Sequence, residues 1–302
     1  MDNKSSGEYF KAIAEVKSIS IAAENLGISQ PALSAYLKKK EKELDAKLFD
    51  RSKQPIELTE VGQAYLDYLN KLQGLQSELN QNIADIEGLK KGKLRVGGAS
   101  FFNVAYIPRA VAEFAKLYQG VEIEIVDGTV PELTTAAHNG ILDLFITPIA
   151  DEDDRFEYEK LLDEKIYIAV PKEWDINKKI KGQKLTKSEF EELCENTFVV
   201  LKNSQHIGKK MEAIFNYYGC RPAHTITAEQ TMTTLALTQS GVGVSLITES
   251  SINNVKLKEL PALYIANEEI CTRAMFIARP MNKYLSKAAA EFIRILKAVN
   301  KK

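Results

Sequence analysis

Hydrophobic residues recur at helical spacing in three blocks near the N-terminus. The i, i+3, i+4 pattern fits residues 10–14 and, in a shorter helix, residues 22–26. Gly27 can adopt a positive φ and end that second helix, while Ser29 is suited to cap a third, with Pro31 tolerated in its first turn. Three helices with one tight turn predict a helix-turn-helix.

The third helix has two chemically different sides. The apolar side is expected to pack against the other helices: Leu33, Tyr36, Leu37 and Leu44. The other side carries small and basic residues: Pro31, Ser34, Ala35, Lys38 and Lys42, with Gln30 at its edge. A helix that enters the DNA major groove by its N-terminal end needs short groups there and cations further along. A solvated helix face would show the same pattern, so this segment alone leaves both interpretations open.

A two-stranded wing is expected after the third helix. Residues 48–51 lead into a short alternating strand at residues 55–59, and Arg51 is the natural phosphate contact in such a wing. Together these segments predict the following DNA-binding residues: Ser29, Gln30, Pro31, Ser34, Ala35, Lys38, Arg51 and Thr59.

A long helix without proline is predicted from Thr59, a suitable N-cap, to Gly88. Its hydrophobic residues follow a 3.5-residue period: Val61, Tyr65, Tyr68, Leu72, Leu75, Leu79 and Ile86. Asn82 interrupts this seam, and a polar group in a seam can fix the register of paired helices. A helix of roughly 40 Å with a narrow apolar seam favours pairing with a second copy of the chain; packing within its own chain is the alternative.

Strands alternate with helices beyond Lys93. The first series has strands at residues 94–97, 121–126 and 144–147 and helices at 104–118 and 132–139. The second has strands at 166–170, 198–201 and 224–228 and helices at 207–218 and 232–240, before a last strand at 274–278 and a last helix at 286–299. This order predicts an α/β ligand-binding domain over residues 89–302, with two parallel-sheet lobes. Lobe I would be residues 89–162 and 267–302, and lobe II residues 163–266. A winged helix-turn-helix (residues 1–59) and a linker helix (residues 60–88) would precede the domain.

Ligands of such folds bind beyond the carboxyl ends of strands, near helix N-termini whose N–H groups favour anions. In lobe I this rule selects Ser100, Phe101, Phe102, Asn103 and Thr147. In lobe II it selects Lys202, Asn203, Ser204, Glu229, Gln230 and Thr231. Their hydroxyl, amide and ammonium groups suit a small carboxylate or another oxyanion. Ordinary helix caps and loop residues are the alternative for each of them.

Charge and composition narrow the functional classes. The net charge of the 302 residues is −1, but residues 28–56 hold seven basic and four acidic side chains, a local excess of three positive charges that suits DNA. No signal peptide or membrane span is evident, which predicts a cytoplasmic protein without a membrane partner. Three cysteines and three histidines lie far apart, without metal-ligand spacing, and no cofactor motif stands out.

Four segments resemble the signature of LysR-type transcriptional regulators, in order and in spacing: residues 22–26, 28–34, 48–51 and 58–62. The chain departs from the family pattern at Ala35, where many members carry arginine, and at Lys40, where an apolar residue is usual. The resemblance implies a winged helix-turn-helix and a two-lobed effector domain similar to periplasmic binding proteins. It also implies a homodimer on an inverted repeat in double-stranded promoter DNA, and it leaves open further pairing into a homotetramer.

An enzyme and a thiol-based redox regulator are the two alternative functions. An enzyme built on the two-lobed scaffold would need a catalytic constellation, and none stands out. A thiol switch, as in peroxide-sensing family members, would need reactive cysteines, but Cys194 and Cys220 are 26 positions apart and Cys194 lies among glutamates, which discourage the thiolate.

Overall fold

The computed structural model describes residues 3–89, 91–150, 153–254, 259–281 and 283–301, and for residues 3–6 and Ser100 the backbone alone. The chain folds into two compact units, one formed mainly by residues 1–82 and the other by residues 83–137 and 142–302. The predicted helix-turn-helix lies in the first unit, and the predicted ligand-binding domain lies in the second.

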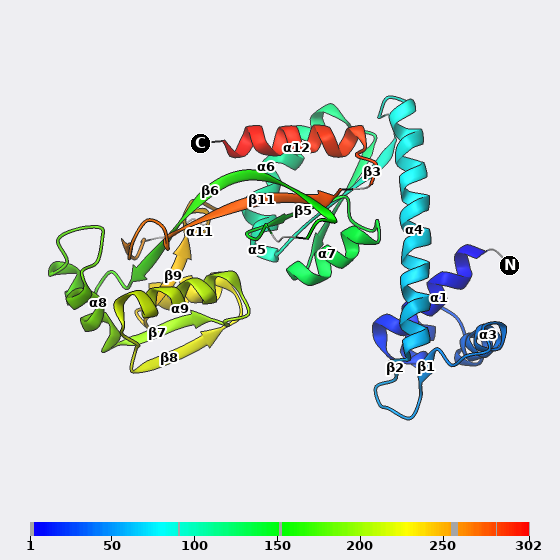
Figure 1. Cartoon of the computed structure of the whole chain (residues 1–302), viewed down its shortest axis with the longest axis horizontal. Coiled ribbons are helices and arrows are strands. Elements are labelled where there is room, and N and C mark those ends of the chain that lie inside the picture. The colour runs from blue at the N-terminus through cyan, green and yellow to red at the C-terminus, as the bar shows by residue number, and fades with distance from the viewer. Residues whose placement is uncertain (1–2, 90, 151–152, 255–258, 282, 302) are drawn as a thin grey trace. The chain divides into compact units, whose positions relative to one another are not determined.

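Three helices and a short hairpin form the first unit's globular head (Figure 1): α1 (Asn3–Val16), α2 (Ile19–Asn25), α3 (Gln30–Glu43), β1 (Phe49–Asp50) and β2 (Glu57–Leu58). Phe10, Ile13, Leu33, Leu37 and Leu48 are fully buried in its core. The predicted wing is present, since β1 and β2 pair antiparallel. The head is therefore the predicted winged helix-turn-helix.

The long helix α4 runs from Glu60 to Ile86, inside the predicted limits. The Thr59 hydroxyl accepts a hydrogen bond from the Gly62 N–H at 2.9 Å and donates one to the Lys47 carbonyl at 2.7 Å. Thr59 therefore caps α4 and fastens the helix to the end of the head.

Among the described residues, the second unit is built on one mixed sheet of nine strands. Its strands are β3 (Gly92–Gly98), β4 (Val121–Asp127), β5 (Leu144–Thr147), β6 (Phe156–Val170), β7 (Thr197–Leu201), β8 (His224–Ala228), β9 (Val244–Thr248), β10 (Ala262–Tyr264) and β11 (Thr272–Pro280). Their order is β4-β3-β5-β11-β6-β9-β7-β8, and β10 pairs with β6. The lobes are not purely parallel, because β11 runs antiparallel to β5 and β6, and β6 runs antiparallel to β9.

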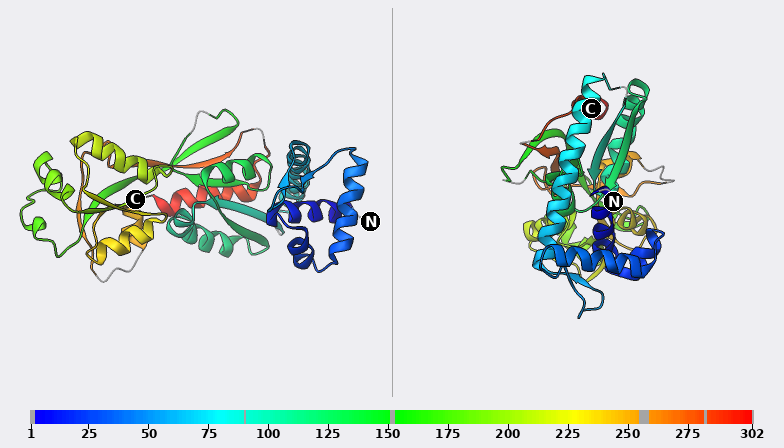
Figure 2. Two further views of the ribbon diagram at one scale, coloured as in Figure 1. Left: turned by 90° about the horizontal axis from the view of Figure 1, so that it is seen from below. Right: turned by 90° about the vertical axis from the view of Figure 1, so that its right-hand side faces the viewer.

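Helices cover each half of this sheet (Figures 1 and 2): α5 (Ser100–Ala105), α6 (Ile107–Leu117), α7 (Val130–His138), α8 (Lys187–Cys194), α9 (His206–Tyr218), α10 (Thr231–Gln239), α11 (Glu249–Asn254) and α12 (Lys287–Asn300). Phe114 of α6 and Phe292 of α12 meet in the core of one lobe, and Phe198 of β7 and Phe215 of α9 in the core of the other. The long strands β6 and β11 connect the two halves.

Several predicted elements differ from the observed ones. The strand expected at residues 166–170 is the end of the 15-residue strand β6. The helix expected at residues 104–118 is two helices, α5 and α6. Helix α8 was not predicted, because its eight residues are too few to establish a clear helical period of hydrophobic positions.

Candidate functional site

The outer face of α3 is exposed and polar, as its sequence predicts. Gln30, Pro31, Ala35 and Lys38 are exposed, and Ser34 is half-buried. Ser29 caps the helix, its hydroxyl accepting the Ala32 N–H at 3.4 Å. The helix therefore offers short groups at its N-terminal end and a lysine one turn later. Leu44 was expected in the core, but it is exposed, because α3 ends at Glu43.

The wing depends on a buried carboxylate that sequence reasoning missed. Glu41, 5% exposed, accepts hydrogen bonds from the Leu48 N–H and from Arg51 Nη2, each at 3.0 Å. One edge of the Arg51 guanidinium is thus held by the head itself, and its side chain is 37% exposed. A glutamate on a lysine-rich helix is expected to be exposed at the surface, so only the tertiary structure reveals this role.

An apolar stripe runs along α4. Its exposed residues are Val61, Tyr68, Leu72, Leu75, Leu79, Ile83 and Ile86, with exposed fractions from 43% to 85%. Two details differ from the predicted seam. Tyr65 packs on Phe10 in the head core, and Asn82 donates to the Glu78 carbonyl of its own helix, so Ile83 continues the stripe instead.

Helices that begin at the predicted ligand-binding positions share one property: α5, α9 and α10 have no side-chain cap. By contrast, Ser18, Ser29, Thr186 and Ser286 cap α2, α3, α8 and α12. A helix N-terminus carries partial positive charge and N–H groups without intrahelical partners. The uncapped ends suit an external acceptor such as an anion.

The lobe I candidates have different surroundings. Phe101 is half-buried, and Ser100 begins α5 with its side chain outside the described part of the structure. The Asn103 amide nitrogen donates to Gly98 O at 3.2 Å, to Val126 O at 3.1 Å and to Asp127 Oδ1 at 2.5 Å. Asn103 therefore ties α5 to the ends of β3 and β4.

Two further lobe I candidates are buried. Thr147 is fully buried, and its hydroxyl accepts the Ile149 N–H at 3.2 Å. Phe102 is also buried, and the Arg273 guanidinium lies 5.2 Å from its ring centre. Both side chains therefore belong to the interior of the lobe.

The lobe II candidates lie at the surface. Lys202 and Glu229 form an ion pair with each other, and Gln205 donates to the Glu229 carbonyl at 2.8 Å. Asn203, Ser204 and Gln230 are exposed, and Thr231 is half-buried. The structure therefore joins the two predicted loops, but Glu229 partly neutralises the lysine chosen for binding anions.

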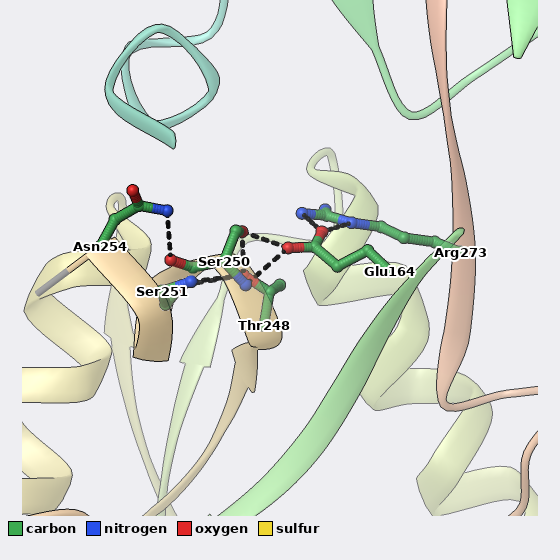
Figure 3. Close-up of polar contacts among 6 residues, drawn as sticks. All are labelled: Glu164, Thr248, Ser250, Ser251, Asn254 and Arg273. Atoms are coloured by element: carbon green, nitrogen blue, oxygen red, sulfur yellow. Dashed lines mark hydrogen bonds and ion pairs between the residues drawn. The ribbon is translucent and has the colours of Figure 1, made fainter. Parts of the chain in front are cut away.

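A buried ion pair at the junction of the lobes was not predicted. Glu164 on β6 and Arg273 on β11 face each other in the antiparallel register and are 2% and 3% exposed. Glu164 also accepts the Ser250 backbone N–H at 2.9 Å and the Ser250 hydroxyl (Figure 3). Burial acts to raise the pKa of Glu164, but Arg273 and Ser250 outweigh it, and the net pKa is lowered. This pair connects both crossing strands to the start of α11.

Two polar side chains from different lobes adjoin this pair. The hydroxyl of Tyr106, which lies between α5 and α6, and Nδ1 of His206 on α9 are buried without a hydrogen bond to the described residues. Burial raises the pKa of Tyr106, and burial followed by the Arg273 charge lowers the pKa of His206 to about 4. His206 is therefore neutral at physiological pH.

The thiols are closer in space than in sequence. The Ala223 N–H donates to the Cys194 carbonyl at 3.0 Å, which brings the segment after α9 alongside the end of α8. Burial and the neighbouring Cys220 thiol raise the pKa of Cys194. Cys194 and Cys220 are therefore neighbours in space, although 26 positions separate them in sequence.

The described residues contain neither a metal-binding cluster nor a helix that could span a membrane. Among them, no three histidine, cysteine, aspartate or glutamate side chains gather as a metal site. None of the helices in that part of the chain has the length and hydrophobicity to cross a membrane.

Comparison with known proteins identifies the family. Residues 6–63 match the bacterial regulatory helix-turn-helix of the lysR family, and residues 87–301 match the LysR substrate binding domain. A probable RuBisCO transcriptional regulator from Cyanidium caldarium is 28% identical over 93% of this chain and 89% of its own length. The RuBisCO operon transcriptional regulator of Allochromatium vinosum is 24% identical over 94% of this chain and 91% of its own. The crystal structure of CbnR, a LysR family transcriptional regulator, matches all of both chains with a TM-score of 0.72 at 18% identity. The chain belongs to the LysR family of DNA-binding transcriptional regulators.

Proposed function

We propose that this regulator binds an interrupted inverted repeat in double-stranded promoter DNA as a homodimer, and that a small anionic effector bound between its lobes controls the binding. The observation that carries the DNA part is the exposed face of α3, where short side chains precede a lysine. A similar full-length structure, with a TM-score of 0.71, is CbnR complexed with its target DNA.

The predicted DNA-binding residues of the head divide into three roles. Gln30, Pro31, Ser34 and Ala35 approach base edges from the start of α3, because the N-terminal end of a recognition helix lies deepest in the major groove. Lys38 and the free edge of Arg51 contact phosphates. Ser29 and Thr59 act through the backbone, since their hydroxyls already hold the ends of α3 and α4.

The partner proposed for the stripe on α4 is the same helix of a second copy. Seven large apolar residues repeat along one side of a 27-residue helix, as in a two-helix seam. Pairing would present two recognition helices to two half-sites. A further pairing through the effector domains would give a homotetramer.

The effector is proposed to lie between lobe I (residues 89–162 and 267–302) and lobe II (residues 163–266). The uncapped N-termini of α9 and α10 support an anion there, with Phe101, Lys202, Asn203, Ser204, Gln230 and Thr231 as contacts. A carboxylate could displace Glu229 from Lys202, because their ion pair is exposed and exposed pairs are weak. Ligand binding alters DNA binding only if it favours one lobe arrangement, and such coupling is typically about 1–3 kcal/mol.

The proposal is tested by fluorescence anisotropy with the promoter DNA beside the gene, at several salt concentrations and with random DNA as competitor. Site-preferring binding that weakens steeply with salt is expected. Ser34→Arg places a bulky side chain at the DNA face and is expected to remove site-preferring binding. Lys116→Ala, at an exposed position of α6 in the effector domain, is the control and should keep it. Equal affinity for promoter and random DNA would refute the assignment of α3 to this promoter.

A further inference from the structure

The carboxylate of Glu41 connects the recognition helix α3 to the first strand of the wing. Glu41 lies in the last turn of α3, and its Oε1 atom accepts the Leu48 N–H at 3.0 Å. Its Oε2 atom accepts Arg51 Nη2 at 3.0 Å and lies 3.7 Å from Lys47 Nζ. One oxygen therefore holds the backbone just before β1, and the other contacts the two cations that flank this strand.

Two acidic side chains near the end of α3 have different surroundings. Glu43 is 45% exposed and pairs with Lys40 at 2.6 Å on the helix surface. Glu41 is buried, and charge-assisted hydrogen bonds within the head compensate its burial. A negative charge beside the proposed DNA face repels phosphates and would weaken DNA binding if charge alone decided its effect. A carboxylate at position 41 therefore calls for a role other than that of its charge.

Arg51 obtains a fixed orientation from this contact. It follows β1 directly, and strand alternation places it on the same side as Phe49, which is buried in the head core. An arginine without a partner samples many rotamers, and ordering such a side chain on binding lowers the affinity. The guanidinium is planar and has several N–H donors, so Glu41 can hold it at one edge while another edge meets a phosphate. The exposed part of the Arg51 side chain leaves room for that second contact.

We propose that Glu41 is a positioning residue for DNA binding, which orients Arg51 toward a phosphate before the DNA binds. The proposal deepens the proposed function and rests on it in one respect: Arg51 must contact the DNA backbone. The expected sign is opposite to that of simple electrostatics. Removing the negative charge of Glu41 weakens DNA binding, because the loss of a fixed Arg51 outweighs the lower repulsion of phosphates. A phosphate contact carries no sequence information, so promoter and random DNA are affected alike.

The sign is tested by fluorescence anisotropy of the full-length protein on promoter and on random DNA. Glu41→Gln keeps the side-chain shape and an oxygen for the Leu48 N–H, but it loses the charge that holds Arg51. Its affinity for both DNAs is expected to fall about three- to tenfold. Glu43→Gln removes the same charge from an exposed position of the same helix, and as the matched control it should bind DNA equally well or slightly more tightly. Unchanged or tighter binding by Glu41→Gln would overturn the proposal.

A double-mutant cycle separates positioning from general support of the wing. Arg51→Ala should lower the slope of log affinity against log salt by about 0.9 for each Arg51 that contacts DNA. In this background, Glu41→Gln is expected to reduce the affinity by less than about a further twofold, because Glu41 acts through Arg51. A second loss as large as the first would assign Glu41 to the support of the wing through Leu48 and would contradict a positioning role.

A variant that keeps the buried carboxylate paired guards against loss of the fold. Arg51→Lys retains a cation beside Glu41 but lacks the planar fork, so its affinity for both DNAs should fall at least about threefold. Binding as tight as that of the unmodified protein would refute the proposed orientation of Arg51. Promoter recognition is judged separately. If the unmodified protein binds promoter no better than random DNA, the promoter assignment fails, and the role of Glu41 is still decided on random DNA. Absent binding to both DNAs would refute the two proposals together.

Discussion

The DNA-binding head and the junction of the two lobes are built in opposite ways. The outer face of α3 comes from ten consecutive residues, Ser29–Lys38, whose exposure follows from helical periodicity. The junction brings together Glu164 and Arg273, 109 positions apart, with Ser250 and His206 from two further segments. The head presents its polar groups to solvent, whereas the junction buries them. Polar groups in the junction therefore depend on each other far more than those on the head.

The largest expected effect is the loss of half of the buried ion pair. Arg273→Met leaves the Glu164 carboxylate buried without its cation, and we expect the free energy of unfolding to fall by about 3–5 kcal/mol. Lys53→Met, which breaks the exposed Lys53–Glu57 pair at 2.5 Å in the wing, should lower the free energy of unfolding far less, because water screens an exposed pair. Urea denaturation measures both. The double variant Glu164→Gln/Arg273→Met should recover part of the lost free energy of unfolding. If Arg273→Met and Lys53→Met lowered that free energy equally, the contrast between buried and exposed polar groups would be wrong.

The second test replaces a closely packed glycine in each region by alanine. A Cβ on Gly62 would lie 2.0 Å from the Leu48 carbonyl oxygen, and one on Gly208, at the start of α9, 2.2 Å from that of Lys202. Each variant should lose about 1–3 kcal/mol of stability, because backbone must move. Gly62→Ala should also weaken promoter binding at least tenfold, and Gly208→Ala should leave it nearly unchanged. Gly182→Ala, whose Cβ has no neighbour nearer than 3.9 Å, is the control. Loss of DNA binding in Gly208→Ala would show that the regions are not independent.

The same contrast explains what the sequence could predict. Helical spacing and turn residues located the head, α4 and most strands, because local preference and fold agree there. Glu41 and Asp85, which are 5% and 4% exposed, were missed, since acidic residues on helices are usually solvated and nothing local marks their burial. Asn103 and Thr147 were placed correctly near strand ends, but their bonds to the backbone, which direct them inward, depend on strand neighbours. The Glu164–Arg273 pair needs the register of β6 and β11, which no local pattern contains.

A smaller effect is expected from pH. Burial, then Arg273, lowers the pKa of His206 to about 4, against about 6.5 in the unfolded chain, so protonation favours unfolding. The contribution of neutral His206 is complete above pH 6.5 and is lost as the pH falls toward 4. Because His206 is only partly buried, we expect about 1–2 kcal/mol over this range. The head contains no histidine, since the three in the chain are at positions 138, 206 and 224. Urea unfolding of His206→Gln should lack this slope, and exposed His224→Gln should keep it; an unchanged slope in His206→Gln would assign the effect to other groups.

The smallest expected effect concerns the reactivity of the thiols. It is confined to the effector domain, because all three cysteines lie outside the head. Cys194 and Cys271 are buried, and burial is the largest cause of the raised pKa of both thiols, so neither forms thiolate readily at pH 8. Alkylation at pH 8 followed by mass spectrometry should modify the half-buried Cys220 first, with promoter affinity changed less than twofold. Cys220→Ser should remove the fast-reacting thiol without affecting DNA binding. One result would contradict this expectation: hydrogen peroxide forms a disulfide between Cys194 and Cys220, seen as a loss of two mass units, and the promoter affinity changes. Because Cys194 and Cys220 are close in space, their separation in sequence does not argue against this disulfide. The experiment therefore tests whether the protonation and burial of Cys194 prevent it.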